Sequence, residues 1–160
     1  MNVLLINNQA NPELSGIASH FKYIEKELLS SKYTVFRLVA SNTASNQAEP
    51  NVKYFFFGYE QQTDNEEPAI SSRVLKNQES FKKALKEIPW SHVDLVIIAN
   101  DIYVPSLIEH VSRDKILVII PSSLKFSELS NPDNFRSVQN RIQKNLRGMK
   151  VVVLSEHMRK

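Results

Sequence analysis

The sequence predicts an α/β fold: a Rossmann-like, doubly wound parallel sheet of about six strands with helices on both faces. Short continuous runs of Val, Ile and Leu alternate along the chain with segments of helical periodicity. Continuous apolar runs indicate strands that are covered on both faces, and their alternation with helices is typical of parallel sheets. Right-handed crossovers leave few topologies, and double winding is the first choice among them.

The composition indicates one domain. The chain has 160 residues, of which 42% are hydrophobic, so it can bury one sizeable core. Lys and Arg number 20 and Asp and Glu number 17, which gives a formal charge of +3 with both signs interspersed. This balance predicts a mixed, solvated surface and no nucleic-acid partner. The absence of cysteine excludes disulfides and thiolate metal sites.

No signal peptide and no membrane-spanning stretch is recognisable in the sequence. A cytoplasmic protein is therefore expected, and peripheral attachment to a membrane stays open as an alternative.

The first strand and helix form the unit on which the expected site depends. Asn2–Ile6 is a short apolar strand, and Gly16–Ser30 is a helix that Ser15 is placed to cap. The apolar stripe of this helix is Ile17, Phe21, Ile24 and Leu28. Glycine at a helix start lets backbone amides approach an anion, and the helix dipole favours negative charge there. An ordinary tight turn is the alternative explanation for Gly16.

The other predicted elements follow in alternation. The strands are Tyr33–Val39, Val52–Phe57, Asp94–Ala99, Lys115–Ile120 and Lys150–Leu154. The helices are Val74–Ile88, which Pro89 ends, Pro105–Val111, and Asp133–Leu146, which Gly148 ends. Two polar stretches, 40–51 and 60–72, are expected to be loops. The second is expected to be a mobile excursion, with an interaction loop as the alternative.

Polar residues follow the carboxyl ends of several predicted strands, where doubly wound sheets bind their ligands. They include Asn7, Asn8, Asn100, Asp101, Tyr103, Ser122 and Ser123. Such side chains suit a hydroxyl-rich ligand, although strand ends are also polar simply because loops are polar. Asp101 is suited to act as a general base or to bind a sugar hydroxyl, and equally to cap the helix after it.

Several well-known motifs are missing. The sequence has no G-x-G-x-x-G fingerprint and no Walker loop, which disfavours NAD and ATP. It has no H-E-x-x-H and no G-x-S-x-G, and its four histidines lack metal-ligand spacing, so no metal site is expected. His20 lies one turn past Gly16, near the expected site, although a solvent-facing packing role weighs more for this residue.

Three segments resemble the GT-B glycosyltransferases of the glycogen synthase-like, retaining group (glycosyltransferase family 4-type). N-P-E-L-S-G-I at 11–17 resembles their P-P-E-x-G-G-I loop. D-L-V-I-I-A-N-D at 94–101 resembles D-V-V-H-A-H-D, and V-V-V-L-S-E-H-M-R-K at 151–160 resembles V-I-A-V-S-E-x-M-R-K. All three occur in the order and spacing of that family. The resemblance covers essentially the whole chain, but only the N-terminal half of such an enzyme.

The resemblance implies that residues 1–160 are the acceptor-side Rossmann-like domain of an enzyme that transfers a sugar from a nucleotide-sugar to a hydroxyl acceptor. The covalently linked donor-binding domain would be absent here, and the isolated chain inactive. Such enzymes need no metal or cofactor, because helix-terminal amides and basic side chains stabilise the departing diphosphate.

The site residues that the resemblance implies fall into three groups. The catalytic pair is Asn100 and Asp101. The donor diphosphate would lie against Ser15, Gly16 and Ile17, and the acceptor against Asn8, His20, Tyr103 and Ser122.

The sequence also departs from the family pattern. Ser15 replaces the first glycine of the loop, Asn100 replaces a histidine, and Pro121 stands where a T-x-H segment has its histidine. Asparagine can hydrogen-bond a sugar hydroxyl but cannot exchange a proton as histidine does. The competing hypothesis is a complete small α/β module that binds a nucleotide or a partner without catalysis. A flavodoxin-like FMN binder ranks last, because Asn7–Leu14 lacks the Ser and Thr of a flavin phosphate loop.

Overall fold

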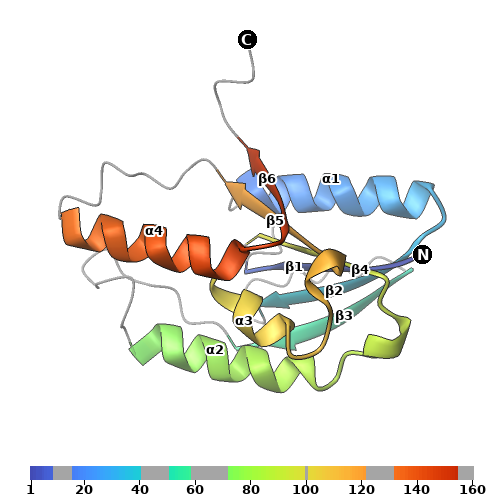
Figure 1. Ribbon diagram of the computed structural model, residues 1–160. Helices are drawn as coiled ribbons and strands as arrows, with labels where there is room; N and C mark the ends of the chain where they lie inside the picture. The colour runs from blue at the N-terminus through green and yellow to red at the C-terminus, as the bar shows by residue number, and fades with distance from the viewer. Residues whose placement is uncertain (9–15, 41–50, 59–71, 100, 122–131, 155–160) are drawn as a thin grey trace, which may run out of the picture.

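A six-stranded parallel sheet forms the centre of the protein (Figure 1). The computed structural model describes residues 1–8, 16–40, 51–58, 72–99, 101–121 and 132–154. The strand order is β3-β2-β1-β4-β5-β6, and all five strand pairs are parallel. This is the order of a doubly wound Rossmann-like sheet. The predicted fold class is confirmed.

The elements alternate along the chain as the sequence predicts. The strands are β1 (Asn2–Asn7), β2 (Thr34–Ala40), β3 (Val52–Phe57), β4 (Leu95–Ile98), β5 (Ile116–Pro121) and β6 (Lys150–Leu154). The α-helices are α1 (Gly16–Ser30), α2 (Ser72–Leu85), α3 (Val104–Leu107) and α4 (Pro132–Leu146). Short 3-10 turns lie at η2 (Trp90–His92), η3 (Asp101–Tyr103) and η4 (Arg113–Lys115).

Two helices are shorter than predicted. α2 ends at Leu85 instead of Ile88, because the following amides donate to carbonyls only three residues back, as Ile88 does to Leu85. Pro89 contributes by disfavouring the helical conformation of the residue before it. α3 ends at Leu107 instead of Val111, where the amide of His110 makes the same kind of three-residue turn.

Helices cover both faces of the sheet. On one face, α1 packs Phe21 against Val3 and Leu5 of β1 and Val35 of β2. On the opposite face, α2, α3 and α4 pack against alternate strand residues such as Leu4. Figure 1 shows α1 on one side of the strands and α2 and α3 on the other. Because successive strand side chains point to opposite faces, the uninterrupted apolar run of β1 is buried on both sides.

β6 departs from this pattern. Its sequence is as apolar as that of the inner strands, yet Val151, Val152 and Val153 are all exposed. In the described part of the sheet β6 is an edge strand that pairs with β5, and the exposure of three successive valines means that neither of its faces is fully covered. A continuous apolar run therefore identifies the strand here, but not its burial.

No helix in the described ranges is long and apolar enough to cross a membrane.

We expect Phe81→Ala to lower the free energy of unfolding by about 3–5 kcal/mol. The Phe81 ring is fully buried, 5.4 Å from the Phe57 ring and 4.3 Å from the Tyr103 ring (centroid to centroid), so its loss leaves a cavity. Urea denaturation measures the change. Phe56→Ala is the control, because Phe56 is an exposed aromatic ring, and it should change stability by less than about 1 kcal/mol. Equal losses in the two variants would contradict the assigned core.

Candidate functional site at the carboxyl edge of the sheet

The direction of winding reverses between β1 and β4. The chain passes from β1 to β2 and β3 on one side, and from β4 to β5 and β6 on the other. The two strands are neighbours up to their carboxyl ends, where Ile6 pairs with Ile98 and the amide of Ala99 donates to the Ile6 carbonyl at 3.1 Å. Doubly wound sheets bind ligands in the crevice outside such a switch point. The residues that follow β1 and β4 are therefore the candidates for a site.

The start of α1 lies beyond the end of β1. Gly16 is the first residue of the helix and is exposed, and a Cβ built on it would meet no heavy atom within 4 Å. Ile17 is half-buried and packs against the apolar cluster under α1, while His20 is exposed one turn later. The structure thus places Gly16 at a helix start, where the dipole of a 15-residue helix has its positive end.

Asp101 is held by two side chains of α4. Arg141 Nε donates to Asp101 Oδ2 at 3.1 Å, and Asn145 Nδ2 donates to the same oxygen at 3.1 Å. Asn145 Nδ2 also lies 3.2 Å from the Asp101 carbonyl oxygen. Arg141 Nη2 lies a further 3.4 Å from Asp101 Oδ1. A carboxylate has about four acceptor positions, so the Asp101 carboxylate keeps capacity for one more hydrogen bond while α4 sets its orientation.

The alternative role predicted for Asp101, capping the next helix, is not what the structure shows. The N-cap residue of α3 is Tyr103, and no side chain caps that helix. Asp101 instead opens η3 and joins this turn to α4.

Tyr103 lies in the core. It is only 4% exposed, and its ring stacks on Phe81 and meets the edge of Phe57 at 5.8 Å between centroids. The ring is therefore not a surface on which a ligand can stack. The sequence analysis put Tyr103 among the polar residues of the edge and could not show that its ring completes an aromatic cluster.

The other predicted site residues divide into two groups. Asn8 lies at the carboxyl edge directly after β1 and is half-buried. Ser15, Asn100 and Ser122 fall outside the described residues. Within the described ranges, no three His, Cys, Asp or Glu side chains are grouped to hold a metal ion.

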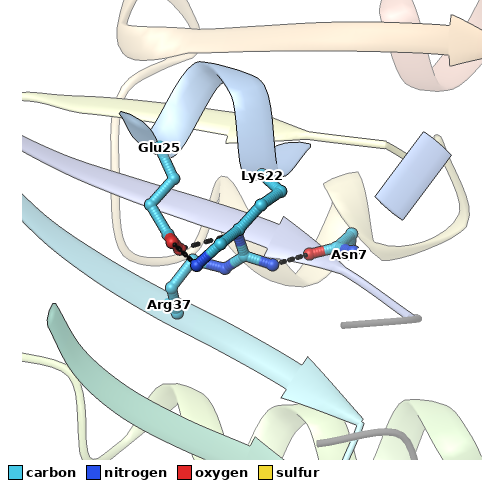
Figure 2. A network of polar contacts seen from close by, with 4 residues as sticks. All are labelled: Asn7, Lys22, Glu25 and Arg37. Atoms are coloured by element: carbon cyan, nitrogen blue, oxygen red, sulfur yellow. Dashed lines mark hydrogen bonds and ion pairs between the residues drawn. The ribbon is translucent and has the colours of Figure 1, made fainter. Parts of the chain in front are cut away.

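The structure adds a buried charged network that the sequence reasoning missed (Figure 2). Arg37 of β2 and Glu25 of α1 form an ion pair, with Arg37 Nη1 3.0 Å from Glu25 Oε2. Arg37 Nη2 donates to Asn7 Oδ1 at 2.8 Å, and Lys22 Nζ lies 2.7 Å from Glu25 Oε1. Burial lowers the pKa of the Arg37 guanidinium from its ordinary value, and the negative charge of Glu25 opposes this shift.

Both charged residues carried a signal in the sequence. Arg37 interrupts the apolar run T-V-F-R-L-V-A of its strand. Glu25 follows Phe21 by four residues, so helical periodicity places it on the same buried face. A charge on a buried position of each of two neighbouring elements predicts a pair, since isolated buried charges are costly.

No protein-family model matches the chain, and no curated protein matches it either. The fold defines the class of protein: a Rossmann-like α/β domain with polar side chains at the carboxyl edge of its parallel sheet.

We expect Asp101→Ala to lower the free energy of unfolding by about 1–3 kcal/mol, because Arg141 and Asn145 lose their common acceptor. Thermal or urea unfolding measures the loss. Glu27→Ala, on the exposed face of α1, should have little effect. In a double-mutant cycle, Asp101→Ala and Arg141→Ala should be non-additive by at least about 0.5 kcal/mol. Additive losses would show that the pair does not link η3 to α4.

Proposed function

We propose that this chain is the acceptor-side half of a retaining, two-domain glycosyltransferase that uses a nucleotide-sugar donor and a hydroxyl acceptor. The observation that carries the proposal is that Gly16 begins α1, the helix that follows β1 in the chain, and β1 is one of the two strands of the switch point. The likeness of residues 11–17, 94–101 and 151–160 to the glycogen synthase-like group supports the same function.

The chemistry follows from this position. Sugar transfer leaves negative charge on the departing diphosphate, and a helix start supplies positive potential to oppose it. Glycine at this point leaves space for a phosphate to approach the backbone. Asp101, oriented by Arg141 and Asn145, would accept a hydrogen bond from a sugar hydroxyl. The basic side chains that complete the diphosphate site would belong to the donor-binding domain, so the isolated chain would not transfer sugar.

A non-catalytic α/β binding module is the second candidate. The observation in its favour is that two expected site residues have structural roles. Asp101 forms an ion pair with Arg141, and the Tyr103 ring lies in the core. Such a module would bind a nucleotide or a partner at the same edge without turnover.

The size of the natural gene product separates the two candidates. An immunoblot with an antibody raised against this chain should show a band of roughly twice its mass of 18.4 kDa, as two domains of similar size require. A panel of nucleoside-diphosphate sugars should then show transfer by that gene product. A band at 18.4 kDa would leave the proposed transferase without its donor half and would favour the module.

On the active gene product, we expect Gly16→Ala to lower kcat/KM roughly 10- to 100-fold with little loss of stability. The added methyl group meets no heavy atom within 4 Å outside its chain neighbours and its own helix backbone, so its effect would fall on the approach of the phosphate. Gly148→Ala is the matched control. Gly148 has a φ of 76°, so alanine there should cost about 1 kcal/mol of stability and leave transfer unchanged. Undiminished transfer by Gly16→Ala would refute the proposed diphosphate contact.

A further inference from the structure

Arg37 stands in the middle of an inner strand. In the sheet register it lies opposite Leu5 of β1 on one side and Tyr54 of β3 on the other. Arg37 lies two residues after Val35 in the strand, so both side chains point to the same face, the one that α1 covers. Arg37 is only 2% exposed, which is a rare environment for a guanidinium.

The guanidinium joins three elements that are distant in sequence. One nitrogen bonds Glu25 in α1 and another bonds Asn7, the last residue of β1, while the backbone of Arg37 belongs to β2. Figure 2 shows the Arg37 side chain extending between the Glu25 carboxylate and the Asn7 side chain, with Lys22 on the second oxygen of Glu25. Among the described residues, Arg37 Nε is a buried nitrogen without a hydrogen-bond partner. The two Nη contacts therefore account for the orientation of the guanidinium.

Stability alone does not explain this arrangement. A buried ion pair loses its hydration, and apolar residues of similar volume often stabilise a protein equally well or better. The neighbours of Arg37 on this face, such as Val35 and Phe21, would pack well against an apolar side chain. What an apolar residue cannot supply is a directed donor to Asn7 Oδ1, which sets the orientation of the Asn7 amide.

We propose that Arg37 is a positioning residue, which holds the carboxyl end of β1 through Asn7 and holds α1 through Glu25. The two contacts fix the end of β1 and α1, which begins at Gly16, relative to each other. This deepens the proposed function and rests on it only for the ligand that the start of α1 would bind. A site needs such supporting contacts, because a small displacement of a binding group weakens its action.

The test compares variants that separate position from stability. Arg37→Met combined with Glu25→Leu removes both buried charges, so no unpaired carboxylate is left inside the protein. Asn7→Ala removes the acceptor of Arg37 at the end of β1 and leaves the Arg37–Glu25 contact in place, and Asn7→Asp keeps an acceptor oxygen for Arg37 and is the rescue variant. Arg113→Met is the matched control, because Arg113 bonds the carbonyls of Asn145 and Arg147 at the end of α4.

Hydrogen exchange of backbone amides is the measurement, with urea denaturation to compare global stability. In Arg37→Met/Glu25→Leu we expect an unchanged or higher urea midpoint, and at least about tenfold faster exchange at residues 7–8 and 16–24. Asn7→Ala should accelerate exchange at residues 7–8, and Asn7→Asp should restore the slow rate. Arg113→Met should leave both segments unchanged.

Two results would overturn the proposal. One is unchanged exchange at residues 7–8 in Asn7→Ala. The other is acceleration spread evenly over the chain together with a lower urea midpoint, which would mean a role in stability alone. If the double variant does not fold, the Asn7→Ala and Asn7→Asp pair decides. The measurement needs no sugar or nucleotide, so its outcome is independent of whether the gene product proves to be a transferase.

Discussion

The burial of β1 on both faces is the constraint on which the other elements depend. Residues 3–6 of this strand are completely buried, and its two edges pair with β2 and β4. A strand in this position requires a helix layer on each face, because neither face can be left to water. α1 supplies one layer, and α2 and α3 contribute to the other. With right-handed connections, helices cover both faces when the chain adds strands first on one side of β1 and then on the other. The direction of winding therefore reverses beside β1. The location of the candidate site is thus a consequence of how the core is built.

On each side of the switch point, a polar residue is held by an arginine from another element. Arg37 of β2 bonds Asn7 at the end of β1, on the face of α1. Arg141 of α4 bonds Asp101, which follows β4. The two contacts differ in surroundings, since the Arg37 side chain is 3% exposed and the Arg141 side chain 30% exposed. Hydrogen bonds to charged groups are directional and stronger than neutral ones, so they suit the task of orienting polar side chains at the margin of an apolar core.

The polar residues of the edge show how far sequence reasoning reaches. Asn8 and Asp101 were predicted at the carboxyl edge, because residues that follow parallel strands must collect there. The ring of Tyr103, two residues later, packs on Phe81 instead. The partners of Asp101 come from 40 and 44 residues further along the chain. No local pattern connects Asp101 with Arg141 and Asn145, because their contact depends on how α4 lies against η3.

The sequence by itself determined the class of fold, the six strands and the packing stripe of α1, because burial leaves a periodic apolar pattern in the chain. It determined the ends of α2 and α3 less well, since three-residue hydrogen bonds near a helix end leave no comparable pattern. Only the tertiary structure decided that the valines of β6 are exposed and that Arg37, Glu25 and Asn7 form one network. The physical reason is that sheet order and long-range side-chain contacts depend on the packing of elements that are far apart in the sequence.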